Sequence, residues 1–224
     1  MAATDIVSQL ISSDILTEVE DDESFGITNE FRTAVNKSKE WLQSADEAEI
    51  RDEIQSRGFE HTAATSLEEL VEPDVSFVAN FLTLHAQLNN DQVDEFIPIC
   101  LLLQQIDTTP PPDEGAPSMF LPIHGNQLHT VISLADNAIV YIWLDDCDPC
   151  DIMQAEYEEL FDNTSNEIGL FSIYGPDWSE LLQSEFDIVG GPVSLFVKNG
   201  QIDTRLYGAH RQSKLEKEIE KLQA

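Results

Sequence analysis

Two cysteines three positions apart, Cys147 and Cys150 in the run Cys-Asp-Pro-Cys, are the residues of this 224-residue chain best suited to chemistry. Cysteines at this spacing at the start of a helix can form a disulfide with little strain. The first then faces the free amides and the positive end of the helix, which favour its thiolate, the form that attacks a disulfide. The second is placed to attack the resulting mixed disulfide and release the substrate. The pair therefore predicts thiol–disulfide exchange.

The same spacing is also half of a structural zinc site, which needs four ligands. The sequence has three cysteines and no second Cys-x-x-Cys pair, and its histidines show no ligand spacing. We therefore expect no metal and no cofactor apart from a redox-active disulfide between Cys147 and Cys150. The third cysteine, Cys100, lies in an apolar run and is expected to be a small buried residue, with a regulatory thiol as the alternative.

The elements that position this pair follow from the apolar pattern. Residues 138–144 form a near-continuous apolar run, typical of a central strand buried on both faces, and the run ends shortly before the first cysteine. Strands and helices alternate around it. Strands are expected at 119–121, 168–174, 193–197 and 202–207, and helices at 126–134, 152–161, 178–186 and 213–222. This order predicts a mixed sheet covered by helices.

The first half of the chain has a different pattern, which predicts helices throughout. Apolar residues recur at steps of four, three and four from Phe77 to Leu88, so they share one face of a helix that opens after Asp74. Ser66 and Glu69 have the spacing of a capping box, which predicts the start of another helix. We therefore expect an all-α domain here.

The clearest boundary lies at three consecutive prolines, Pro110 to Pro112, which cannot continue a helix and favour an extended spacer. We place a helical N-terminal domain at residues 1–107, a proline-rich linker at 108–116 and a second domain at 117–224.

Three segments of the second domain resemble thioredoxin. They are I-V-Y-I-W-L-D-D-C-D-P-C, D-I-V-G-G-P-V-S-L-F-V-K-N-G and L-Y-G-A-H-R-Q-S-K-L-E-K-E-I, in the order and at the separations of that family. The resemblance covers roughly residues 117–224 and implies an α/β thioredoxin fold, a mixed central sheet flanked by helices. It also implies roles for five residues. Cys147 would be the nucleophile, Cys150 the resolving thiol, Pro192 after Gly191 a cis-proline that presents backbone groups to a substrate peptide, and Gly208 a small residue beside the substrate groove.

The chain departs from the family at three positions near the pair. Tyr141 stands where the family often has a buried carboxylate, and Ile173 stands, by alignment, where its basic partner usually lies. Losing both avoids an uncompensated buried charge. Asp146 replaces the usual tryptophan before the first cysteine. Because acidic neighbours disfavour the thiolate, we predict a reducing rather than a strongly oxidising potential.

These features lead to two hypotheses about function. The first is a thiol–disulfide oxidoreductase, a protein-disulfide reductase whose helical domain docks or selects partners. Its partners would be protein disulfides and an upstream reductase. The second is a non-catalytic interaction protein that keeps the thioredoxin fold as a scaffold, favoured by the missing buried acid and the large helical half. The two cysteines favour the first.

The charge of the chain is strongly negative, with 43 acidic residues against 11 basic and a net charge of −32. Such a surface repels itself at low salt and is screened in molar salt, which favours a halophilic protein, with an ordinary acidic protein as the alternative. Binding to nucleic acid or to an anionic membrane is disfavoured because phosphate contacts need Lys and Arg. The N-terminus has no basic and apolar secretory pattern, and no apolar run is long enough to span a membrane. We therefore expect a cytoplasmic protein.

Overall fold

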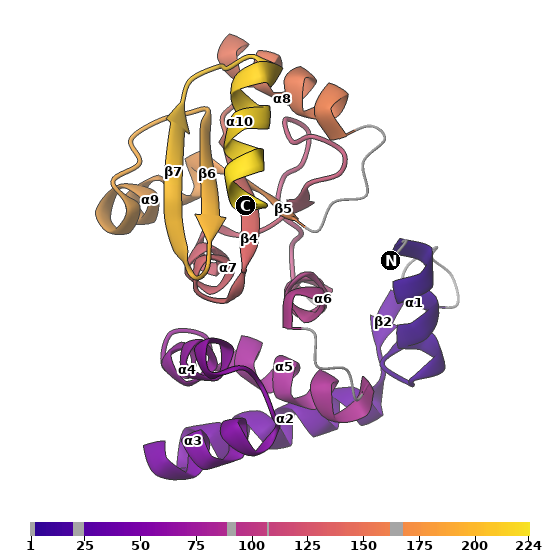
Figure 1. Ribbon diagram of the computed structural model, residues 1–224. Helices are drawn as coiled ribbons and strands as arrows, with labels where there is room; N and C mark the ends of the chain where they lie inside the picture. Colours follow the sequence, from indigo (N-terminus) through magenta and orange to yellow (C-terminus); the bar gives the residue numbers. More distant parts are fainter. Residues whose placement is uncertain (1–2, 20–24, 89–92, 107, 162–167) are drawn as a thin grey trace. The chain divides into compact units, whose positions relative to one another are not determined.

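The computed structural model describes residues 3–19, 25–88, 93–106, 108–161 and 168–224 (Figure 1). The chain divides into two compact units, residues 1–109 and residues 110–224. None of the helices in these ranges combines the length and the apolar character needed to cross a lipid bilayer.

The first unit is mostly helical, as expected. It also contains a small antiparallel pair of strands, β1 with β2, which the sequence did not predict. Its elements are α1 (Ala3–Ser12), β1 (Leu16–Glu18), β2 (Phe25–Ile27), α2 (Asn29–Ser44), α3 (Glu47–Ser56), α4 (His61–Leu70), α5 (Val75–Leu88) and α6 (Val93–Gln105).

Helix starts in this unit follow the capping residues. The Asp74 carboxylate accepts the amide of Phe77, which confirms the expected start of α5. The capping box predicted at Ser66 is wrong, because Ser66 lies inside α4. A capping box is present at α3 instead, where Asp46 accepts the amide of Glu49 and the Glu49 carboxylate accepts the amide of Asp46.

The second unit has a five-stranded mixed sheet in the order β3-β5-β4-β6-β7 (Figure 1). Strands β3, β5 and β4 are parallel, β6 is antiparallel to β4, and β7 is antiparallel to β6. The expected fold class is thereby confirmed. The elements are β3 (Leu121–Pro122), η1 (Gly125–Gln127), α7 (Leu128–Leu134), β4 (Asn137–Trp143), α8 (Asp148–Phe161), β5 (Gly169–Tyr174), η2 (Gly175–Trp178), α9 (Ser179–Phe186), β6 (Val193–Lys198), β7 (Gln201–Tyr207) and α10 (Gln212–Leu222).

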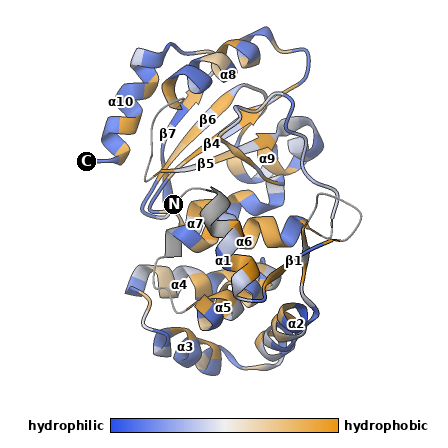
Figure 2. Ribbon diagram, turned by 90° about the vertical axis from the view of Figure 1, so that its right-hand side faces the viewer, coloured by the Kyte–Doolittle hydropathy of each residue, from blue (hydrophilic) through white to orange (hydrophobic). Residues whose placement is uncertain are grey.

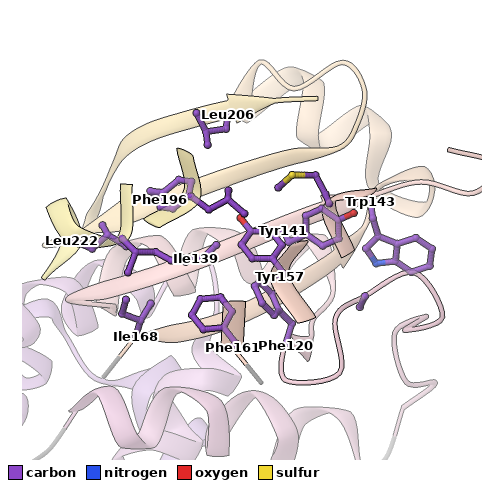
Figure 3. Close-up of a cluster of buried hydrophobic side chains, with 14 of the residues drawn as sticks. Phe120, Ile139, Tyr141, Trp143, Tyr157, Phe161, Ile168, Phe196, Leu206 and Leu222 are labelled. Carbon is purple, nitrogen blue, oxygen red and sulfur yellow. The ribbon is translucent and has the colours of Figure 1, made fainter. Parts of the chain in front are cut away.

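Helices cover both faces of this sheet, so β4 is buried along nearly its whole length, as its apolar run predicts. Figure 2 shows the central strands in hydrophobic colours. Helices α8 and α10 bury one face over the cluster in Figure 3, which includes Ile139, Tyr141 and Phe196. On the other side, η1 lies against η2, where a Cβ on Gly125 would meet the Trp178 side chain at 2.4 Å. This layering holds the end of β4, and the cysteines after it, in a fixed place.

Candidate redox site

The two cysteines form a disulfide at the N-terminus of α8, with Cα atoms 5.2 Å apart. Helix α8 begins at Asp148, four residues before the expected start at 152. Asp148 and Pro149 therefore occupy its first turn, where an acid is favoured and proline is tolerated. The Cys147 carbonyl accepts the amides of Cys150, at 2.7 Å, and Asp151, at 3.2 Å. Cys147 thus caps the helix and is half-buried, whereas Cys150 is buried.

The three residues expected to contact substrate lie together beside the end of β4. The Gly191–Pro192 peptide bond is cis. The amide of Gly208 donates to the Pro192 carbonyl at 2.9 Å, and a Cβ on Gly191 would stand 3.0 Å from Leu144 Cγ. Because the residue after Pro192 pairs with Ile142 of β4, this loop borders the strand that leads into the cysteine pair.

A tyrosine hydroxyl contacts the turn that carries the second cysteine. Tyr141, in the middle of β4, donates its hydroxyl proton to the Cys150 carbonyl at 3.0 Å. The residue beside Tyr141 on β5 is Ser172, so the alignment that placed Ile173 there is wrong by one position. Ile173 pairs with Ile142 instead, and its side chain points to the opposite face of the sheet. Sequence reasoning marked Tyr141 as a departure from the family but did not find this hydrogen bond.

Comparison with known proteins identifies this half of the chain. The thioredoxin family model matches residues 121–221. This part of the chain has the thioredoxin fold. The helical half is matched by no family, and a search of curated proteins found no match.

Several solved thioredoxins resemble the chain. The thioredoxin of Malassezia sympodialis is 24% identical, and the match covers 46% of this chain and 90% of that one with a TM-score of 0.40. A point mutant of the thioredoxin of Halobacterium salinarum is 22% identical over 46% and 91% of the two chains, with a TM-score of 0.39. Oxidised mitochondrial thioredoxin 3 of Saccharomyces cerevisiae is 20% identical over 46% and 94%, with a TM-score of 0.40.

The loop before the first cysteine of the thioredoxin domain is acidic and held by a tyrosine. Asp145 and Asp146 are exposed, and Asp146 adopts a left-handed conformation with φ of 48°, which an aspartate tolerates better than most residues. Tyr174, at the end of β5, donates its hydroxyl proton to the Asp145 carboxylate. This hydrogen bond is the main factor that raises the pKa of Tyr174 to about 12. The sequence carried no signal for this contact.

Part of the expected linker packs on the thioredoxin domain next to the site. We call residues 113–118 the strap. Ala116 is buried, its carbonyl accepts Gln154 Nε2 of α8 at 2.9 Å, and the amide and hydroxyl of Ser118 both donate to the Glu158 carboxylate. A Cβ on Gly115 would lie 2.3 Å from the Trp143 ring. The strap therefore covers Trp143, the last residue of β4.

Trp143 itself belongs to the core. The residue is 3% exposed, its ring centroid lies 4.8 Å from that of Tyr174, and its Nε1 has no hydrogen-bond partner among the residues described. In those same ranges, no group of three or more His, Cys, Asp or Glu side chains is placed to hold a metal ion.

Proposed function

We propose that this protein is a thiol–disulfide oxidoreductase that reduces protein disulfides through Cys147 and Cys150. The observation that carries the proposal is the disulfide at the N-terminus of α8, with its first cysteine half-buried and its second buried. The partly accessible Cys147 caps the helix, where the positive end of the dipole favours a thiolate.

The chemistry proceeds in two exchanges. The Cys147 thiolate attacks one sulfur of the substrate disulfide, forms a mixed disulfide and releases the other substrate sulfur as a thiolate. Cys150 then loses its proton and attacks Cys147 Sγ. The Cys147–Cys150 disulfide forms, the bond to the substrate breaks, and the second substrate sulfur leaves as a thiolate. The substrate gains two electrons, and a reductase must return two electrons to the pair.

The loop that carries the cis peptide is the proposed binding edge. Gly191, Pro192 and Gly208 would offer backbone groups to an extended substrate peptide, as an added strand does. Val189 is 76% exposed and Tyr207 is 53% exposed, so apolar surface is available on both segments of this edge.

The helical domain, residues 1–107, is proposed to dock or select the protein partner, with residues 108–116 as the connection to the domain at 117–224. The partners would be protein disulfides and an upstream reductase in the cytoplasm of a halophile. The large acidic excess supports a salty working environment, in which exposed charges are screened.

The pair is proposed to be reducing. Four exposed aspartates lie beside it in the chain: Asp145, Asp146, Asp148 and Asp151. Their negative charge disfavours the thiolate and so makes the reduced form of the pair less stable. A redox titration in molar KCl is expected to give a potential far below that of a strong oxidant. A value of about −120 mV would refute this part of the proposal.

The function is tested by insulin reduction in molar KCl, with wild type compared with Cys147→Ser. The wild type is expected to reduce insulin disulfides and the variant to be inactive, because serine cannot form the mixed disulfide. Equal activity of the two proteins would end the enzymatic interpretation. Inactivity of both would favour the scaffold hypothesis.

A further inference from the structure

The turn that carries the resolving cysteine is tied to the rigid centre of the sheet by one side chain. Tyr141 is fully buried in β4, between Ser172 on β5 and Ser194 on β6. Its hydroxyl donates to the Cys150 carbonyl. Figure 3 shows its ring beside that of Tyr157, and the two ring centroids are 5.6 Å apart.

We propose that Tyr141 is a positioning residue for the resolving step, in which its hydroxyl holds the first turn of α8 so that Cys150 Sγ faces Cys147. This inference rests on the proposed function, because it concerns the second of the two exchanges.

The geometry supports a positioning role. A helical carbonyl accepts one amide four residues on, and its second lone pair is free for a side chain. The Tyr141 hydroxyl donates to that second lone pair. Tyr141 lies in β4, which is hydrogen-bonded to β5 and β6, and Phe120 and Tyr157 pack against its ring. The hydrogen bond therefore connects Cys150 to the central strand of the sheet. Holding two reacting groups in place raises the rate of their reaction.

The same hydroxyl is a poor proton acceptor. Burial is the main cause that raises the pKa of Tyr141 well above its ordinary value, and the negative charge of Asp151 adds to it, so the phenol stays neutral. Other titratable groups beside the pair in the chain are Asp145 and Asp146 in the preceding loop and Asp148 on α8, and His210 contacts α8 further along, through its amide and Met153 Sδ. The neutral Tyr141 hydroxyl therefore does not accept the proton of the Cys150 thiol, and it acts through geometry.

Ellman's reagent separates the two exchanges. With the reduced full-length protein in molar KCl, Cys147 attack releases the first thionitrobenzoate and forms a mixed disulfide. Attack of Cys150 on that disulfide then releases the second thionitrobenzoate. The Cys150→Ser variant identifies this second phase because it abolishes it. Both phases are followed by absorbance in a stopped-flow instrument between pH 6 and pH 9.

Tyr141→Phe is expected to leave the first phase unchanged and to slow the second about fivefold, the effect of one hydrogen bond of ordinary net strength. The pH dependence of the second phase should keep its midpoint, because the lost hydroxyl is not the proton acceptor. The equilibrium constant for forming the Cys147–Cys150 disulfide against glutathione should fall by a similar factor, which gives a second readout.

Tyr157→Phe is the matched control, because it removes a buried hydroxyl that donates to Ser194 Oγ at 2.8 Å in the same core. It is expected to leave both phases unchanged. The proposal is overturned if Tyr141→Phe resolves as fast as wild type, if both variants slow equally, or if the midpoint of the pH profile moves. A wild type that shows no fast first phase would instead contradict the proposed function.

Discussion

The contact between the strap and Trp143 leaves no room for a methyl group at position 115. An added Cβ on Gly115 would lie 2.3, 2.6 and 2.9 Å from three atoms of the Trp143 ring. These distances are below van der Waals contact, so Gly115→Ala must displace either the ring or the strap. Trp143 is 3% exposed and its ring packs at a tilt against that of Tyr174, so the ring has little freedom to move.

The size of the effect follows from this geometry. Forcing one extra methyl group into a well-packed site costs about 1–3 kcal/mol of unfolding free energy. If the strap detaches instead, the unit loses the burial of Ala116 and the hydrogen bonds that Gln154 and Glu158 make to the strap. For a unit of this length, we expect Tm to fall by about 5–10 °C.

Differential scanning calorimetry of the oxidised full-length chain in molar KCl measures this change. Gly190→Ala is the control, because a Cβ there meets no atom within 4 Å. The Tm of the control is expected to be close to that of wild type, and the Tm of Gly115→Ala is expected to be clearly lower than both. If the two variants unfold at the same temperature, the strap does not pack on Trp143 as described.

Two further predictions concern titration and thiol access. Burial alone would raise the pKa of Glu218, but its ion pairs with Lys214 and Lys221 together lower it below its ordinary value. The stability that these pairs contribute is present above the pKa of Glu218 in the unfolded state and is lost as pH falls through its pKa in the folded state. Glu218→Gln should therefore reduce the loss of stability at acid pH in a curve of unfolding free energy against pH. An unchanged loss would contradict this. Cys100 is buried. Its burial and the nearby charge of Asp74 raise the pKa of its thiol. Iodoacetamide should therefore label no thiol in the oxidised native chain and one after unfolding, whereas rapid native labelling would contradict the burial.

The strands and helices of the second unit were predictable from sequence because apolar runs and helical spacing repeat over many residues. The strand at 138–144 and the cysteines after it gave the position of the site directly. The start of α8 was missed because Asp148 and Pro149 carry no apolar periodicity, although both residue types suit a first helical turn.

Side-chain neighbours across strands were harder to predict. An alignment offset of one residue placed Ile173 beside Tyr141, and in a strand one position changes the face of the sheet. The capping pattern at Ser66 predicted a helix start that the structure does not have. Its spacing matches that of Asp46 and Glu49, but a serine is also tolerated inside a helix, and only the fold decides which pattern caps.

Short elements and packed loops left too little pattern in the sequence. Strands β1 and β2 have three residues each, too few for an alternation to stand out. The strap follows three prolines, which indicated an extended spacer. Its contacts to Trp143 and α8 depend on residues far away in sequence, so no local pattern could reveal them.

Covalent trapping tests the central claim most directly, because it identifies the reacting sulfur. Reduced Cys150→Ser is mixed with oxidised insulin in molar KCl, and the adduct is mapped by mass spectrometry. The account predicts a mixed disulfide between insulin and Cys147 that a reductant releases, and none with Cys147→Ser. An adduct through Cys100, or equal adducts from both variants, would contradict the account.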